Sequence, residues 1–504
     1  MPAGTTSTTR NADFLRSQSS EASSIFRYLS YKHLVPALLL GLILRLFFII
    51  HFPFYAGDTK FYEELARNWL DHGVYGLFVH GQLISVDMRM PGYPAFIAGI
   101  YAALGRSSRT VMLFQTVIDL ITCVLTAIIA ASIAPIRSKS RVAAIALWIA
   151  ALCPFTANYN AVVLTEVLAT FLTTLVVLTF VAALDRASTD SSSEPPGSTT
   201  LLSETAWWLL TGLLIGIGTL VRPETPLLLL AAGLVLSVYW RRRKNWSKLF
   251  LAVAWMSAGL ILTLAPWAAR NARTMGRIEF LAPRYAETYG DFIPRGFYAW
   301  TGTWMVRFSE AYLVTWKLGK EPLRVEELPA TAFDSNTERS RVESLFDQYN
   351  SNLLMTPALD RGFLILARER THRRPVRTYI EIPLARTWTM WFTPRIALLP
   401  YSGNLWPPAE KWRSNRMDFG VTSGFGVLNF VYAAMALVGA WRFRRHPAVA
   451  FLITLVLVRT AVLTQLQTVE PRYVIVCYPI IIALGALAWS FPLPEDSLGA
   501  ESGT

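Results

Sequence analysis

The sequence predicts an all-α polytopic membrane protein. Of its 504 residues, 53% are hydrophobic and only 16% are charged, whereas an average soluble domain carries about 25% charged residues. The mean hydropathy is +0.37. Apolar runs long enough, or nearly long enough, to cross about 30 Å of hydrocarbon recur along the chain. These observations exclude an ordinary soluble enzyme and predict about 10 transmembrane helices.

The predicted spans follow from the apolar runs and from the basic residues between them. The runs cover 34–52, 110–133, 142–160, 162–184, 206–221, 226–240, 249–267, 421–441, 448–464 and 473–491. A further run at 92–105 is ambiguous. If it crossed the membrane, the basic clusters at 137–141 and 241–248 would fall outside, against the tendency of basic loops to stay in the cytoplasm. We therefore interpret 92–105 as a juxtamembrane or re-entrant helix.

This topology divides the chain into parts with different expected roles. It predicts a disordered cytoplasmic tail at 1–33 and a cytoplasmic tail at 492–504, and it makes the Ser- and Pro-containing stretch 185–205 a cytoplasmic linker. The remaining parts are a transmembrane module at 34–280 with an external loop at 53–109, an external segment at 281–420, and C-terminal transmembrane helices at 421–491.

Charge and cysteine content exclude several function classes. The net charge is +13, but the basic residues form short clusters between apolar runs, which indicates membrane topology and not nucleic-acid binding. The three cysteines, Cys123, Cys153 and Cys477, lie in apolar runs without metal-ligand spacing. Neither a disulfide framework nor a zinc site is therefore expected, and no glycine-rich phosphate loop is present.

The first external loop places a carboxylate at the membrane surface. Asp58 follows Gly57, and the apolar residues after it repeat at helical spacing until Gly73, which should end the helix. We expect this helix to lie flat on the bilayer. Asp58 can cap the helix, act as a catalytic group, or do both.

Other charged residues are predicted at the same membrane surface. Each has a structural alternative: Arg89 can pair with lipid headgroups, and Glu166 is favoured in a first helical turn by the helix dipole. Taken together, they form a carboxylate pair with several arginines able to bind phosphate oxygens. The candidate site residues are Asp58, Glu166, Arg89, Arg222, Arg270 and Arg472. This set suits a membrane-anchored phosphate ester handled at the outer leaflet.

Two charged residues lie inside predicted spans. Arg45 is seven residues before the external end of the first span and Asp119 nine residues after the external start of the second. At about 1.5 Å per residue, the two lie roughly 10 and 13 Å deep. An unpaired charge there is costly, so we expect the two side chains to pair and to brace the first span, with snorkelling by Arg45 as the alternative.

The order of these motifs resembles the GT-C glycosyltransferases, in particular bacterial members similar to protein O-mannosyltransferases and to the lipid A aminoarabinose transferase. The resemblance covers about 34–280 and 421–491. It rests on Gly57-Asp58 and the helix that follows, Arg89-Met-Pro-Gly-Tyr-Pro, Leu164-Thr-Glu166, Leu220-Val-Arg-Pro-Glu224, Pro266-Trp-Ala-Ala-Arg-Asn271 with Gly276, and Glu470-Pro-Arg-Tyr473.

The resemblance implies a GT-C fold and a polyprenyl-phosphate-linked sugar as donor. It implies that Asp58 is the catalytic base. Many relatives carry a second acid directly after this aspartate, where this chain has Thr59, so a divalent metal ion is left open as a cofactor. The external segment 281–420 matches no motif, and we expect it to select the acceptor. Its tryptophans, which include Trp300, Trp304 and Trp388, suit sugar stacking or anchoring at the interface.

The expected function is inverting transfer of a sugar from a polyprenyl-phosphate carrier to a hydroxyl of a glycan, lipid or protein. The active site would face the periplasm from the inner membrane. Asp58 would act as general base, Glu166 would orient the acceptor or assist Asp58, and the arginines would bind phosphate. The alternatives are a transporter or flippase of lipid-linked sugars, and a non-catalytic partner in glycan assembly.

The topology makes a direct prediction. Single cysteines introduced into 53–109 should react with an impermeant thiol reagent added outside the cell, whereas cysteines in 241–248 should react only after the cytoplasm is opened. A cytoplasmic position 89 would overturn both the ten-span topology and the external site.

Overall fold

The computed structural model describes residues 28–189, 198–283, 292–466 and 468–491. Within them the chain is mainly helical, and it forms one two-stranded sheet. The predicted tails at 1–33 and 492–504 lie wholly or mostly outside these residues. The predicted linker 185–205 is partly helical, because α8 continues to Thr189 and α9 begins at Ser198.

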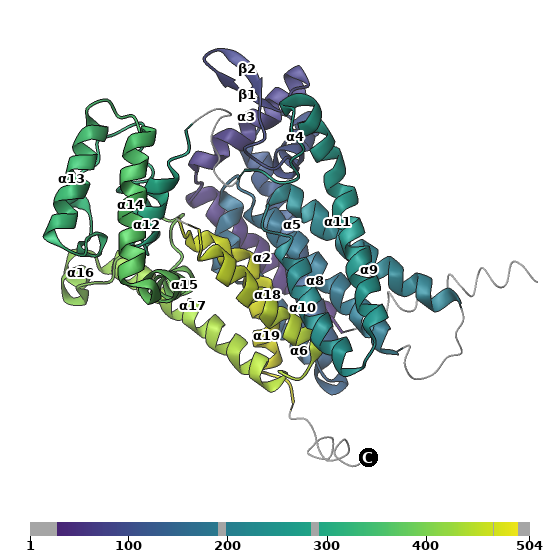
Figure 1. The fold of residues 1–504 in the computed structure, drawn as a ribbon. Helices are drawn as coiled ribbons and strands as arrows, with labels where there is room; N and C mark the ends of the chain where they lie inside the picture. Colours follow the sequence, from purple (N-terminus) through teal and green to yellow (C-terminus); the bar gives the residue numbers. More distant parts are fainter. Residues whose placement is uncertain (1–27, 190–197, 284–291, 467, 492–504) are drawn as a thin grey trace, which may run out of the picture.

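Each of the predicted apolar runs forms helix, and most of these helices pack side by side in one bundle (Figure 1). The bundle contains α2 (Tyr31–His51), α5 (Ser108–Ile133), α6 (Lys139–Ala151), α8 (Glu166–Thr189), α9 (Ser198–Val221), α10 (Leu227–Arg242), α11 (Trp246–Met275), α17 (Arg416–Arg442), α18 (Pro447–Leu463) and α19 (Tyr478–Leu487).

The span count of ten is not confirmed. Among the described residues, six helices are long and apolar enough to cross a membrane, or seven if one bent pair counts as a single span. The bent pair joins 136–151 to 154–161 at an angle of 43°. Pro154 lies at this bend, and it has no backbone N–H to continue the hydrogen bonds of the preceding helix. Helices α10 and α18 have only 16 and 17 residues, and at about 1.5 Å per residue they fall short of a 30 Å core.

Short elements cover one end of the bundle, which we call the α3 end (Figure 1). They are α3 (Gly57–His72), the antiparallel strands β1 (Gly76–Val79) and β2 (Gln82–Ser85), and α4 (Gly92–Leu104). The predicted end of α3 is confirmed. Gly73 caps this helix with a φ of +66°, a conformation that glycine adopts without strain. Sequence patterns did not reveal the hairpin.

The described residues of the segment 281–420, which are 281–283 and 292–420, contain a second group of helices beside the bundle (Figure 1). Its elements are α12 (Arg295–Gly302), α13 (Asn336–Asn350), α14 (Pro357–Arg373), α15 (Ile382–Trp391) and α16 (Pro408–Ser414). Trp300 and Trp304 are buried in its core against Phe346 and Phe363. These two tryptophans therefore pack the segment internally and present no ring to a sugar or a membrane.

Close packing fixes α9 against α11. A Cβ at Gly212 would come within 2.2 Å of the Met256 carbonyl oxygen, and one at Gly259 within 2.5 Å of the Leu213 nitrogen. Small residues let apolar helices approach closely where lipid supplies no hydrophobic driving force. This contact sets the position of the C-terminal end of α9, from which Arg222 extends.

The two charged residues inside the bundle contact each other. Arg45 on α2 is fully buried, and its Nε donates to Asp119 Oδ2 on α5 at 2.8 Å. Its Nη1 donates to the carbonyls of Gly41 and Ala151, and Asn160 Nδ2 donates to Asp119 at 2.9 Å. The pair thus ties α2 to α5 and α6.

Breaking this pair should be costly. Arg45→Ala or Asp119→Ala should each lower the free energy of unfolding by about 3–5 kcal/mol, because the remaining charge stays buried without its partner. The double variant should lose clearly less than the sum of the two. Equilibrium unfolding in detergent measures the free energy of unfolding of the wild type, the two single variants and the double variant. Additive losses would contradict a direct pair.

Candidate functional site

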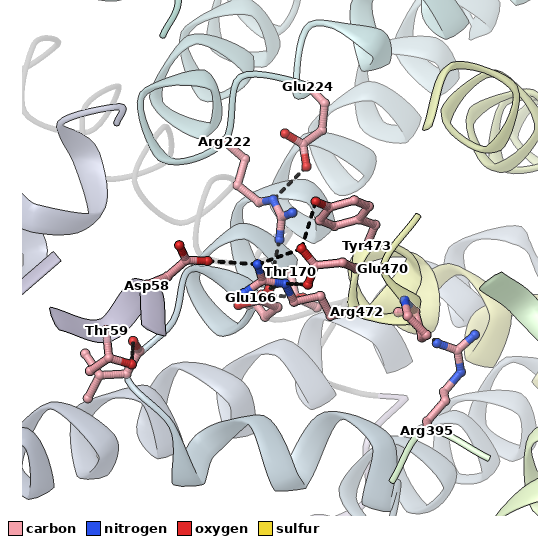
Figure 2. A network of polar contacts seen from close by, with 12 residues as sticks. Asp58, Thr59, Glu166, Thr170, Arg222, Glu224, Arg395, Glu470, Arg472 and Tyr473 are labelled. Atoms are coloured by element: carbon pink, nitrogen blue, oxygen red, sulfur yellow. Dashed lines mark hydrogen bonds and ion pairs between the residues drawn. The ribbon is translucent and has the colours of Figure 1, made fainter. Parts of the chain in front are cut away.

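Five of the six predicted site residues meet at the α3 end of the bundle, and Figure 2 shows four of them, Asp58, Glu166, Arg222 and Arg472. They come from segments far apart in the chain: the start of α3, the stretch before α4, the start of α8, the turn after α9, and the 3-10 helix η7 (Pro471–Cys477) before α19. The residues are Asp58, Arg89, Glu166, Arg222 and Arg472.

Asp58 lies in the first turn of α3, but it does not cap the helix. The N-cap residue is Ala56, which makes no side-chain cap bond. The Asp58 carboxylate instead accepts from Arg89 Nη2 at 2.9 Å and from Arg472 Nη2 at 2.8 Å, and it is 24% exposed. Burial would raise the pKa of Asp58, but the two guanidiniums outweigh burial and lower it. Asp58 is therefore an accessible carboxylate that stays ionised at neutral pH.

Arg472 stands among three carboxylates. Besides Asp58, its Nε lies 2.5 Å from Glu470 Oε2 and 3.7 Å from Glu166 Oε1. Burial raises the pKa of Glu470, and the nearby carboxylates of Asp58 and Glu166 add to this while Arg472 opposes it. One guanidinium thus holds together three acids that would otherwise repel each other.

The network continues through two residues that the sequence analysis did not single out: Glu224, which lies in one of the motifs, and Arg459, which lies in the apolar run 448–464. Arg222 Nη1 lies 3.2 Å from Glu166, and its Nε lies 2.6 Å from Glu224 Oε1. Arg459 Nη2 on α18 lies 3.0 Å from the same oxygen. An arginine within the apolar run 448–464 was the signal for Arg459, because a charge there requires a partner.

The members of the network differ in exposure. The side chains of Asp58, Arg89 and Arg472 are 21–24% exposed, those of Arg222 and Glu224 are 10% and 15% exposed, and those of Glu166 and Arg459 are 1% and 5% exposed. In the described part of the chain, Glu166 Oε2 is buried without a hydrogen-bond partner. A ligand would therefore meet Asp58 and its two arginines first.

Arg270 does not join this network. Its two Nη atoms donate to the carbonyls of Tyr75 at 2.7 Å and Val86 at 2.9 Å, which flank the β1–β2 hairpin. The guanidinium also lies over the rings of Tyr75 and Trp267. In this structure Arg270 connects the two ends of the β1–β2 hairpin to α11 by these hydrogen bonds.

The residues around Asp58 do not fit a bound divalent metal ion. The hydroxyl of Thr59, the residue directly after Asp58, is buried and donates to the Val163 carbonyl at 3.0 Å. Both carboxylate oxygens of Asp58 are paired with guanidiniums. Within the described ranges, no group of three or more His, Cys, Asp or Glu side chains is arranged to hold a metal.

This arrangement can bind a phosphate and accept a proton. Arginine guanidiniums pair with phosphate oxygens in the same forked geometry that they use with carboxylates. An ionised carboxylate beside them, open to solvent, is suited to remove a proton from a hydroxyl within hydrogen-bond reach. Burial behind the site strengthens the interaction with an anion, because the surrounding dielectric is low.

Comparison with known proteins gives matches among solved structures alone. No protein-family model matches the chain, and no curated protein matches it. The crystal structure of an oligosaccharyltransferase of Archaeoglobus fulgidus in complex with Zn and sulfate is 14% identical, with a TM-score of 0.46, over 90% of this chain and 48% of that one. The AglB enzyme of the same organism, in complex with an inhibitory peptide and a dolichol-phosphate, is 14% identical, with a TM-score of 0.47, over 91% and 50%.

This chain thus spans about half the length of the solved structures that it matches.

The ion pairs of Glu224 make a prediction about pH. Burial would raise the pKa of Glu224, but Arg222 and Arg459 outweigh it and lower this pKa to about 2. Its contribution to stability is thus complete above its ordinary pKa and is lost as the pH falls toward 2. Glu224→Gln should have a lower Tm than the wild type at pH 7, and the difference should shrink between pH 5 and pH 3.

The matched control is Glu343→Gln, which changes an exposed carboxylate on α13. Its Tm should follow that of the wild type at each pH. A Glu224→Gln difference that stays constant down to pH 3 would show that Glu224 is not held ionised by the two arginines.

Proposed function

We propose that this chain is a membrane glycosyltransferase that moves a sugar from a polyprenyl-phosphate carrier to an acceptor hydroxyl of a glycan, a lipid or a protein. The observation that carries the proposal is the accessible Asp58 carboxylate between Arg89 and Arg472, at one end of a bundle of apolar helices. A lipid-linked phosphate reaches such a position from the bilayer, and a water-soluble acceptor reaches it from outside.

The donor phosphate would bind the guanidiniums that pair with carboxylates in this structure. Arg89 and Arg472 are the accessible members of the network, and Arg222 lies behind them at 3.2 Å from Glu166. A phosphate that replaces Asp58 as their partner frees the Asp58 oxygens. Donor binding would therefore both position the sugar and release the base, and this couples the two halves of the reaction.

Transfer then requires one substitution at the anomeric carbon. The acceptor oxygen attacks that carbon from the face opposite the phosphate, and its proton passes to Asp58. The bond between the anomeric carbon and the phosphate oxygen breaks, the configuration inverts, and polyprenyl phosphate leaves with the electron pair. The arginines stabilise the negative charge that develops on the phosphate, so no acid catalyst is needed. Glu166 would orient the acceptor or assist Asp58.

The proposal includes an orientation in the cell. The α3 end would face the periplasm from the inner membrane, because the basic stretches 137–141 and 241–248 lie at the other ends of their helices. The segment 281–420 would then lie on the acceptor side. A flippase or transporter of lipid-linked sugars and a non-catalytic partner in glycan assembly remain the rival functions, and the base variant separates them.

Replacing the base should abolish transfer while leaving the fold intact. Asp58→Asn removes the proton acceptor but preserves the size and shape of the side chain, so transfer should fall by about 10²- to 10⁴-fold. The measurement is release of polyprenyl phosphate from a lipid-linked sugar that the wild type accepts. Asp71→Asn is the matched control, because Asp71 lies on the same helix and pairs with Arg106 at the surface.

The outcome distinguishes the three functions. An enzyme loses turnover in Asp58→Asn and still binds the donor, whereas Asp71→Asn keeps both. A flippase moves the lipid-linked sugar across vesicle membranes without cleaving it, and a non-catalytic partner cleaves nothing in wild-type form. Turnover by Asp58→Asn at the wild-type rate would show that the assigned mechanism is wrong.

A further inference from the structure

Helix α15, the last helix of the segment 281–420 before α16, packs against the loop that carries Glu470 and leads to Arg472. Met390 on α15 is fully buried with Leu463, Val469 and Val474. Val469 and Val474 flank the Glu470–Tyr473 motif, so this small apolar cluster encloses the motif on both sides. The next residue of α15, Trp391, donates through Nε1 to Thr460 Oγ1 at 3.0 Å.

A buried arginine on α15 holds the first part of this loop. Arg386 is 4% exposed, and its Nη1 donates to the Thr464 carbonyl at 3.0 Å, directly after α18. Its Nε and Nη2 donate to the carbonyls of Met305 at 2.9 Å and Gly302 at 3.1 Å, at the end of α12. One side chain therefore joins the loop to the helical group of the segment 281–420.

A second buried arginine holds the other end of the loop. Arg395 follows α15, is 5% exposed, and donates through Nη1 to the Pro471 carbonyl at 2.7 Å. Figure 2 shows it beside the Arg472 end of the network. Its Nη2 donates to the carbonyls of Met390 at 2.9 Å and Trp391 at 3.1 Å. Pro471 directly precedes Arg472, so Arg395 holds the backbone from which Arg472 extends.

The cost of this arrangement indicates a positional role. Within the described residues, neither Arg386 nor Arg395 forms an ion pair. Arg395 also donates through Nε to Asn429 Oδ1 at 3.4 Å and lies over the Tyr478 ring, so all its partners are neutral. A buried guanidinium with only neutral partners still loses its hydration.

Arg395 also has a φ of +58°, which residues other than glycine rarely adopt. A costly conformation persists where the surrounding contacts determine it. Among these contacts, the bonds to the Thr464 and Pro471 carbonyls hold the two ends of the loop that leads to Arg472.

We propose that α15 is the positioning element for the phosphate site and that Arg395 is a positioning residue for Arg472, acting through the Pro471 carbonyl. The consequence for phosphate rests on the function proposed above. Because α15 belongs to the segment 281–420, the part of the chain expected to meet the acceptor is rigidly joined to the part expected to bind the donor.

The first experiment needs no ligand. Amide hydrogen exchange of the full chain in nanodiscs should be faster across Val469–Tyr473 in Arg395→Met than in the wild type, because Met cannot hold the Pro471 carbonyl. Arg374→Met is the control: it removes the same charge from an exposed position after α14 and should leave this exchange unchanged. Unchanged exchange in Arg395→Met would overturn the positioning role.

The second experiment measures the affinity for farnesyl phosphate, a small polyprenyl monophosphate. Arg395→Met should weaken binding by about tenfold, the equivalent of losing one hydrogen bond to a charged group. In an Arg472→Gln background the same change should have no further effect, because Arg395 acts through Arg472. Arg395→Lys keeps the charge and one donor and should recover part of the affinity.

The two experiments separate the two proposals. Additive losses in the double variant would show that Arg395 affects binding by a general loss of structure, and this would overturn its action through Arg472. A wild type that does not bind farnesyl phosphate would count against the proposed function, while the exchange experiment still decides whether α15 holds the loop.

Discussion

The site depends on one cation, the guanidinium of Arg472, which lies among the carboxylates of Asp58, Glu166 and Glu470. Three carboxylates on the face of an apolar helix bundle repel each other strongly, because little water is present to screen them. The guanidinium makes their approach favourable, and its several donors let it serve more than one of them at once. For this reason, the first residues of three elements can meet at the α3 end: those of α3, α8 and η7.

The charges around Arg472 alternate in sign from one contact to the next. The contacts run from Arg89 through Asp58, Arg472, Glu166, Arg222 and Glu224 to Arg459, and Glu470 pairs with Arg472, so four arginines meet four carboxylates. Such a network is self-neutralising, so it can form without a ligand and still offer guanidiniums to an incoming anion. The accessible end is where exchange between carboxylate and phosphate costs least, whereas the buried end keeps Arg222 in place. Recognition of phosphate and release of a base would then be one event.

Buried arginines also hold separate backbone segments together elsewhere in the molecule. Arg45 pairs with Asp119 and binds two carbonyls between α2, α5 and α6, and Arg386 and Arg395 bind only neutral acceptors. Arg270 fastens the hairpin base in the same manner. A guanidinium has five donors in a fixed plane, so a single side chain can hold several backbone segments at once.

The sequence by itself determined the helical membrane architecture, the helix that ends at Gly73, and the end of the bundle at which Asp58, Arg89, Glu166, Arg222 and Arg472 gather. Apolar run length, helix-stop residues and the distribution of basic clusters are local signals, readable along one dimension. Asp58 and Arg472 are 414 positions apart, and only tertiary packing decided that they pair. Packing also decided that Arg270 turns to the hairpin, that Trp300 and Trp304 are core residues, and that Arg459 reaches Glu224. These outcomes depend on which helix faces meet and how closely, and that follows from side-chain shape across the whole bundle, which no single stretch of sequence contains.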